Sequence, residues 1–164
     1  MLVLGIDPGS QRTGYGLVDR ERGRYLLRVA GVVRTDADAP IPERLLTIYE
    51  GLSALIAEHQ PDVVAIEAIF RHKSSESALR LGQARGVALL AAAKAGLQIY
   101  EYNAMTVKKT VTGSGKADKD MVSRMVGMLL GSAVKLSADA ADAVAIGMTH
   151  HAHAHQHRAT EKLK

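Results

Sequence analysis

The chain has 164 residues, of which 47% are hydrophobic and 23% charged, a composition typical of one folded domain. It contains no cysteine, which excludes a disulfide framework and any zinc or iron–sulfur site built on cysteine, and which suits a reducing compartment. No apolar run is long enough to span a membrane, and the N-terminus lacks the basic region of a signal peptide. We therefore expect a cytoplasmic protein with no membrane partner.

The formal net charge is +4, but the charge is unevenly distributed. Residues 1–70 carry a net charge of −3, whereas residues 71–135 carry +7. A basic middle segment favours a polyanionic partner, although a solvated basic surface without any partner explains it equally well. Aromatic residues make up only 4% of the chain, which disfavours binding through many stacked rings.

The first sixty residues predict three strands and a helix. Leu2–Asp7 is a buried strand that Pro8-Gly9-Ser10 ends. Thr13–Arg20 and Arg24–Thr35 flank a turn and predict a hairpin, which gives a three-stranded antiparallel meander. Apolar residues then recur at helical spacing from Pro40 to about Gln60.

The remaining chain alternates shorter strands and helices. The continuous apolar run of Val63–Glu67 is typical of a strand in a parallel sheet. A polar loop over Ala68–Ser75 leads into a helix that ends near Lys94 and is apolar all round over Val87–Ala93, so this helix needs cover on two sides. The later expected elements are a strand at Ile99–Tyr102 and helices at Ala104–Val111, Asp120–Leu130 and Ala138–Thr149.

This order of elements predicts an α/β fold with a mixed sheet, in which an antiparallel meander adjoins parallel strands and helices flank the sheet. We expect one domain over residues 1–151. Residues 152–164 form a polar, His-rich tail that we expect to be disordered. The five histidines from His150 to His157 favour adventitious metal binding over a function, with His150 as a possible exception that faces the site.

Two pairs of carboxylates stand out. Asp7 and Glu67 each end an apolar strand, and the ends of adjacent parallel strands lie side by side at the edge where α/β proteins bind ligands. Asp139 and Asp142 are three residues apart on an expected helix of small residues, which puts both on one face. Taken singly, Asp7 could be only a turn former and Asp139 only a helix cap.

If the four acids meet, their repulsion requires protons or cations. Two charges 4 Å apart cost about 4 kcal/mol at an effective dielectric of 20. Oxygen ligands select hard ions, so we expect Mg²⁺, with Mn²⁺ as a substitute. Two ions that share a carboxylate are the template for phosphodiester hydrolysis by water.

Several stretches carry a family resemblance. They are Gly5-Ile6-Asp7-Pro8-Gly9-Ser10, Thr13-Gly14-Tyr15-Gly16, Ala65-Ile66-Glu67, the run from Ser77 to Val87 that contains Leu81-Gly82-Gln83-Ala84-Arg85-Gly86, Tyr102–Val111, and Ala138-Asp139-Ala140-Ala141-Asp142-Ala143. In these the chain resembles the RuvC family of bacterial Holliday junction resolvases, within the RNase H-like superfamily. The resemblance covers roughly residues 2–151 and implies an RNase H-like nuclease domain that cuts four-way DNA junctions by symmetric nicks.

The resemblance also implies roles for individual residues. Asp7, Glu67, Asp139 and Asp142 would form the catalytic, metal-binding tetrad for two Mg²⁺ ions, and Lys108 and Lys119 would act near the cleaved phosphate. Phe70 would contact unstacked bases, although burial against a neighbouring helix is the alternative for this ring. The expected DNA-binding residues are Phe70, Arg71, Lys73, Arg80, Lys108, Lys109, Lys116 and Lys119.

The implied partners are four-way junction DNA, a second copy of the chain and a branch-migration motor of RuvA and RuvB. The apolar surface over Val87–Ala93 is the candidate dimer contact. The Gly113–Lys116 loop lacks the spacing of a nucleotide-binding loop. An actin-like ATPase would need a second domain that 164 residues cannot supply. A module that binds junctions without cutting them would gain nothing from four acids facing phosphate.

Overall fold

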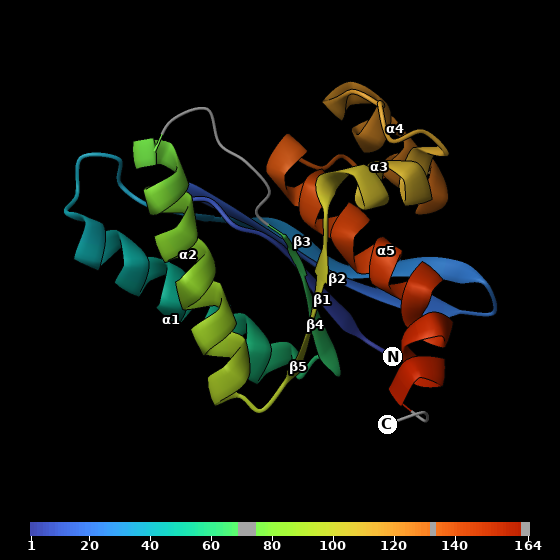
Figure 1. Cartoon of the computed structure of the whole chain (residues 1–164), viewed down its shortest axis with the longest axis horizontal. Helices are drawn as coiled ribbons and strands as arrows, with labels where there is room; N and C mark the ends of the chain where they lie inside the picture. Colours follow the sequence, from blue (N-terminus) through green and yellow to red (C-terminus); the bar gives the residue numbers. More distant parts are fainter. Residues whose placement is uncertain (69–74, 132–133, 162–164) are drawn as a thin grey trace.

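The structure is a computed structural model that describes residues 1–68, 75–131 and 134–161, with side chains as far as residue 154. Five strands form one mixed sheet in the order β3-β2-β1-β4-β5 (Figure 1). The first three strands pair antiparallel, while β1, β4 and β5 run parallel, so the predicted arrangement of meander and parallel strands is confirmed. The strands are β1 Val3–Asp7, β2 Arg12–Glu21, β3 Arg24–Arg34, β4 Val63–Glu67 and β5 Gln98–Tyr102.

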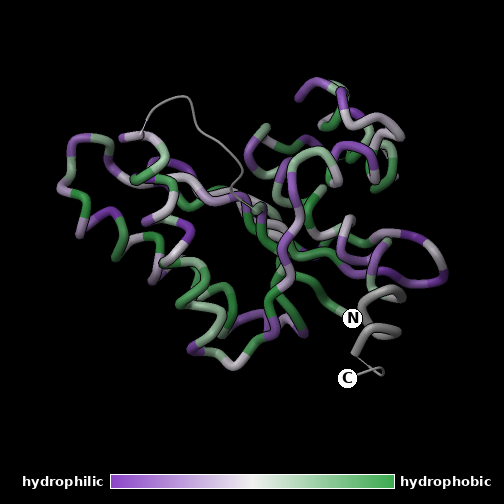
Figure 2. Tube along the Cα trace, viewed as in Figure 1, coloured by the Kyte–Doolittle hydropathy of each residue, from purple (hydrophilic) through white to green (hydrophobic). Residues whose placement is uncertain are grey.

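Helices cover both faces of the sheet (Figure 1). On one face lie α1 (Ile41–His59) and α2 (Ser75–Lys94), and on the other lie α3 (Ala104–Thr112), α4 (Lys119–Leu129) and α5 (Ala138–Glu161). Apolar residues concentrate in the central strands (Figure 2). Because side chains alternate along a strand, Leu4 and Ile6 pack toward α1 and α2, whereas Val3 packs toward α5.

Helix α5 lies unusually close to the sheet. A Cβ atom on Gly5 would overlap the backbone oxygen of Ala143, and one on Gly14 would overlap that of Asp139. Small residues at the contact therefore allow this approach, as the run of alanines around Asp139 and Asp142 predicts. The start of α5 therefore lies against the first residues of β2, beside the end of β1.

Helix α5 continues to Glu161, whereas the sequence predicts that this helix ends near Thr149. Two physical reasons explain the difference. The segment alternates alanine with histidine and contains neither glycine nor proline, so nothing in it breaks the helix. His150 and His151 are also buried, which holds the helix against the protein two turns beyond Asp142. No helix in the described part of the chain is long and apolar enough to cross a membrane.

Candidate active site

The ends of β1 and β4 bring two carboxylates together. The two strands pair in parallel with Ile6 opposite Ile66, so Asp7 and Glu67 are the next neighbours in register. Ile6 and Ile66, which directly precede the two acids, pack toward α1 and α2, so the alternation of a strand directs both acids to the opposite face, where α5 lies. A cavity of about 270 Å³ opens there, lined by Asp7, Glu67, Ala104, Val107, Lys108, Lys119, Val122, Asp142 and Ile146.

The carboxylates at this cleft are electrostatically crowded. Burial, followed by the charges of Glu67 and Asp142, raises the pKa of Asp7 to about 8. Burial likewise raises the pKa of Glu67, whose side chain is hydrogen-bonded to that of Asp7. In the absence of a cation, the pair therefore retains a proton at neutral pH.

Two lysines reach the same cleft from separate helices. The Asn103 side chain caps α3, which carries Lys108, and the Asp118 side chain caps α4, which begins at Lys119. Lys119 Nζ lies 3.3 Å from Asp142 Oδ2, and the Asp142 charge raises the pKa of Lys119. Since 73% of the Lys119 side chain is exposed, this ion pair contributes no more than about 1 kcal/mol.

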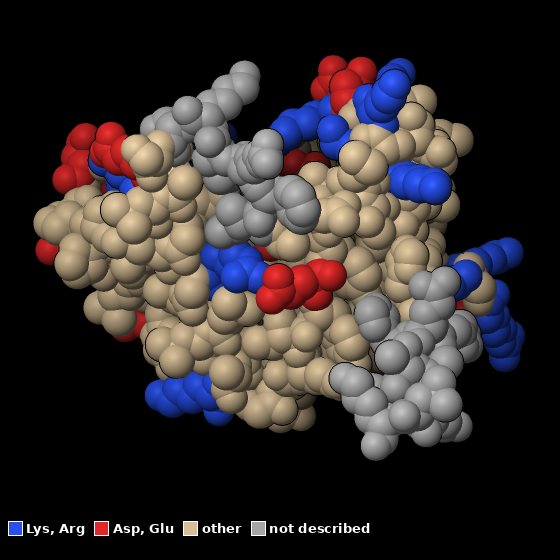
Figure 3. Space-filling view, in the orientation of Figure 1, with Lys and Arg blue, Asp and Glu red and all other residues tan. Residues whose placement is uncertain are grey.

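Asp139 lies beside the cleft and does not line it. Its Oδ2 is 4.0 Å from Nη1 of Arg12, which is 63% exposed at the start of β2. The structure thus brings three of the four predicted acids to one cleft and leaves the fourth one helical turn away. In the space-filling view, acidic atoms lie recessed near basic side chains beside α3 and α4 (Figure 3).

The donor set at the cleft fits a hard divalent cation. All the candidate ligands are carboxylate oxygens, which Mg²⁺ and Mn²⁺ prefer. Burial and their mutual repulsion raise the pKa of Asp7, and Lys119 offsets part of the negative charge. Among the described residues, no three acidic or histidine side chains are already gathered into a ligand shell. These carboxylates are the residues that would hold such a cation.

The structure places the other predicted residues in varied positions. Lys109 and Lys116 are exposed on α3 and on the loop before α4. Arg80 is exposed on α2, where it pairs with Glu76, and it does not line the cleft. Phe70, Arg71 and Lys73 lie outside the described residues.

His150 does not line the cleft, so the alternative in which it is the one histidine that faces the site is not realised. Its ring is only 2% exposed, its Nδ1 lies 2.9 Å from the Tyr102 hydroxyl, and its centroid is 4.3 Å from that of Tyr100. No sequence pattern predicts these aromatic partners, because Tyr100 and Tyr102 reach the histidine only through the pairing of β5 with β4.

Sequence reasoning missed two arginines that support the strand ends. Arg85 of α2 donates from Nε to the backbone oxygen of Glu67 at 3.3 Å and pairs with Glu101 at 2.6 Å. Arg44 of α1 is buried and contacts the loop that follows Asp7. Their positions in the helical pattern could have identified them, because both arginines lie among apolar residues on the packed side of a helix.

Comparisons with known proteins agree with this geometry. The family model described as crossover junction endodeoxyribonuclease RuvC matches residues 3–150. The protein of that name from Serratia proteamaculans is 51% identical over 150 residues, which cover 91% of this chain and 86% of the relative. The one from Citrifermentans bemidjiense is 45% identical over 92% of both chains.

Comparison with solved structures also supports the RuvC family. The Thermus thermophilus RuvC structure in complex with Holliday junction substrate superposes with a TM-score of 0.89 and 35% identity, over 95% of this chain and 96% of that one. The yeast mitochondrial Holliday junction resolvase Ydc2 has a TM-score of 0.65 at 16% identity, which supports the fold alone.

Proposed function

Because the chain belongs to the RuvC family of crossover junction endodeoxyribonucleases, it is a metal-dependent nuclease that resolves Holliday junctions in DNA recombination and repair, and we propose how its residues carry out that reaction. The observation that carries the proposal is the cleft in which Asp7, Glu67 and Asp142 meet two lysines.

The four acids hold the catalytic metal in this proposal. Asp7, Glu67 and Asp142 supply oxygen ligands from the cleft, and Asp139 joins them from the adjacent turn of α5 by leaving Arg12. We propose Mg²⁺ as the ion, two per site, with Mn²⁺ as a substitute, because the ligands are all hard oxygens. When bound, the ions supply an activated water and offset the charge on the leaving oxygen.

The lysines stabilise the substrate's charge. Lys108 and Lys119 approach the cleft from α3 and α4, so their ammonium groups are placed to contact the phosphate that is cut. Water attacks phosphorus, one P–O bond to a sugar breaks, and the products carry a phosphate and a hydroxyl. Lys109 and Lys116 are exposed near the same helices and extend the contact along the DNA backbone. Phe70, Arg71, Lys73 and Arg80 stay predicted DNA contacts.

A second copy of the chain completes the enzyme. Helix α2 has an exposed face on which Leu79 and Leu90 are 64% and 58% exposed. Between them, Gly82 and Gly86 have no atom within 4 Å of an added Cβ, so this face is open and nearly flat. A flat face of small residues flanked by leucines allows close helix–helix packing across a two-fold axis. A two-fold dimer then presents one cleft to each of two strands of the junction.

The cellular setting is also part of the proposal. We propose that the enzyme acts in the cytoplasm on junctions handled by the RuvA–RuvB motor, since the absence of cysteine suits a reducing compartment.

The experiment is metal-dependent cleavage of a synthetic four-way junction, with a linear duplex of the same sequence as the control substrate. We expect cleavage of the junction in Mg²⁺ and Mn²⁺, poor turnover in Ca²⁺, and none in EDTA. Calorimetry should detect Mg²⁺ binding to the protein and a marked loss of it in Asp142→Asn. Glu50→Gln, which alters an exposed acid on α1, is the matched control. Cleavage in EDTA, or normal Mg²⁺ binding by Asp142→Asn, would contradict the proposed site.

A further inference from the structure

Arg44 occupies a position where the pattern of α1 calls for an apolar residue. The buried stripe of this helix consists of Arg44, Ile48, Leu52 and Ile56, each four residues after the last. Arg44 is only 3% exposed, as deeply placed as its aliphatic neighbours. A charged residue at such a position needs a reason beyond solubility.

As far as the structure describes the chain, the hydrogen bonds of the Arg44 side chain go to Ser10 and Thr35. Its Nη2 donates to the Ser10 backbone oxygen at 2.7 Å and lies 3.1 Å from Ser10 Oγ. Its Nε lies 3.2 Å from the same backbone oxygen and 3.4 Å from Thr35 Oγ1. No carboxylate pairs with Arg44 in the part of the chain that the structure describes, so its charge is held by neutral oxygens.

Ser10 belongs to the short loop, residues 8–11, that joins Asp7 to Arg12. Thr35 Oγ1 also donates to the Ser10 oxygen at 2.8 Å, and Thr35 N donates to the Gln11 oxygen at 3.1 Å. The loop is sharply bent, because a Cβ on Gly9 would overlap the backbone of Arg12. Arg44 and Thr35 therefore hold the loop from the side opposite the cleft.

The two ends of this loop are the two residues that matter for the site. Asp7 precedes it and lines the cleft, while Arg12 follows it and faces Asp139 at 4.0 Å. A shift of the loop would consequently move Asp7 and Arg12 relative to α5. Catalysis is sensitive to such shifts, since a misplacement of 1 Å can cost on the order of a hundredfold in rate.

Stability alone does not account for Arg44. Burying a charge costs several kcal/mol, and replacement of buried charged groups by well-packed apolar residues is often neutral or stabilising. We propose that Arg44 is a positioning residue of the active site, which holds the 8–11 loop so that Asp7 and Arg12 keep their places beside Asp139. This inference rests on the proposed function, because it assumes that Asp7 is catalytic.

The experiment compares Arg44→Met and Arg44→Lys with Ile48→Ala, a control on the same buried stripe that does not touch the loop. Each variant is assayed as folded protein, well below its melting temperature. We expect Arg44→Met to lower kcat at saturating junction and Mg²⁺ at least about tenfold, while the junction Kd without metal changes less than twofold. Arg44→Lys, which retains the charge and a donor, should recover part of kcat. Ile48→Ala should lose melting temperature but keep kcat.

A second variant covers the case in which Arg44→Met does not fold. Thr35→Val removes the hydroxyl that donates to Ser10 and accepts from Arg44, and it should also lower kcat without weakening junction binding. The proposal would be overturned if Thr35→Val and Arg44→Lys had the same kcat per folded molecule as the wild type and the Ile48→Ala control. Asp142→Asn distinguishes failure of the positioning role from failure of the proposed active site. If Asp142→Asn is inactive while the Arg44 variants have normal kcat, only the positioning role of Arg44 is disproved.

Discussion

The two faces of the central sheet are built from different residues and do different work. The face under α1 and α2 is packed with large aliphatic side chains such as Leu4, Ile6 and Ile48. The face under α5 is packed more closely, with glycine in the strands against alanine in the helix, and it ends in the acidic cleft. The large aliphatic side chains and the carboxylates thus lie on opposite sides of the same strands.

Two arginines on the α1–α2 side of the sheet contact the backbone near the acids. Arg44 contacts the backbone oxygen of Ser10 in the loop that follows Asp7, and Arg85 contacts the backbone oxygen of Glu67 at the end of β4. The aliphatic face thus supplies the support, and the α5 face supplies the acids that are unfavourable to bury. Substitutions on the two faces should therefore separate catalysis from stability.

The largest expected effect is that of Asp7→Asn on the α5 face. Removing a charge that the reaction needs should lower junction cleavage on the order of a thousandfold or more. The same change relieves repulsion among buried carboxylates, so the metal-free variant should melt at a temperature equal to or above that of the wild type. Gel assays of cleavage and calorimetric melting in EDTA measure the two effects.

Junction binding separates this result from general damage. Asp7→Asn should bind the junction in EDTA as tightly as the wild type, since the Asp7–Glu67 pair already holds a proton at neutral pH without metal and basic side chains supply the phosphate contacts. A variant that cuts normally, or that melts far below the wild type, would show that Asp7 is structural and that the two faces are not divided as described.

The next effect concerns the outer surface of α2. Leu90→Glu places a charge on the proposed dimer face and should raise the dimer dissociation constant at least about tenfold, which corresponds to about 1.4 kcal/mol. Leu46→Glu is the matched control, because Leu46 is a similarly exposed leucine, 54% exposed, on a different helix, α1. Sedimentation equilibrium measures both. A wild-type protein that is monomeric at working concentration, or equal dissociation constants in the two variants, would contradict the α2 interface.

The sequence predicted the fold and the strand-end acids well because short-range patterns determine them. The apolar runs that end in Asp7 and Glu67 predict parallel strands, and alternation then orients both acids. The roles of Arg44 and Arg85 could not be predicted, since both side chains contact backbone oxygens of segments that are far away in the sequence. The position of Asp139 beside the cleft depends on a contact with Arg12 that no pattern reports. The length of α5 was missed because histidine was interpreted as polar, whereas His150 and His151 are buried.

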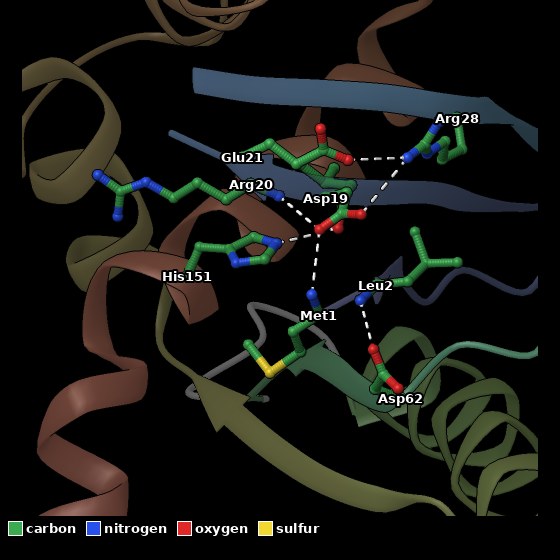
Figure 4. A network of polar contacts seen from close by, with 9 residues as sticks. Met1, Leu2, Asp19, Arg20, Glu21, Arg28, Asp62 and His151 are labelled. Atoms are coloured by element: carbon green, nitrogen blue, oxygen red, sulfur yellow. Dashed lines mark hydrogen bonds and ion pairs between the residues drawn. The ribbon is translucent and has the colours of Figure 1, made fainter. Parts of the chain in front are cut away.

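The smallest expected effect lies at the far end of the α5 face, where His151 packs beside the network around Asp19 (Figure 4). Its Nε2 lies 3.0 Å from the Val18 backbone oxygen, and burial lowers the pKa of His151 below its usual 6.5. The unfolded chain therefore binds a proton below pH 6.5 that the folded protein resists, so stability falls as the pH drops through this range. One such group changes the free energy of unfolding by at most about 1.4 kcal/mol per pH unit.

Asp7 has the opposite effect on the pH dependence of stability, so the measurement is made in a variant that lacks its carboxyl group. Its raised pKa stabilises the metal-free fold at low pH, and this contribution is lost as the pH rises toward about 8. We therefore expect the acid-side loss to be clearest in Asp7→Asn, measured by urea unfolding between pH 7 and pH 5. Adding His151→Gln to that background should flatten the profile, because glutamine can donate to Val18 without titrating. An unchanged slope would mean that His151 is protonated as easily in the folded protein as in the unfolded chain, and that this end of the α5 face is open to water.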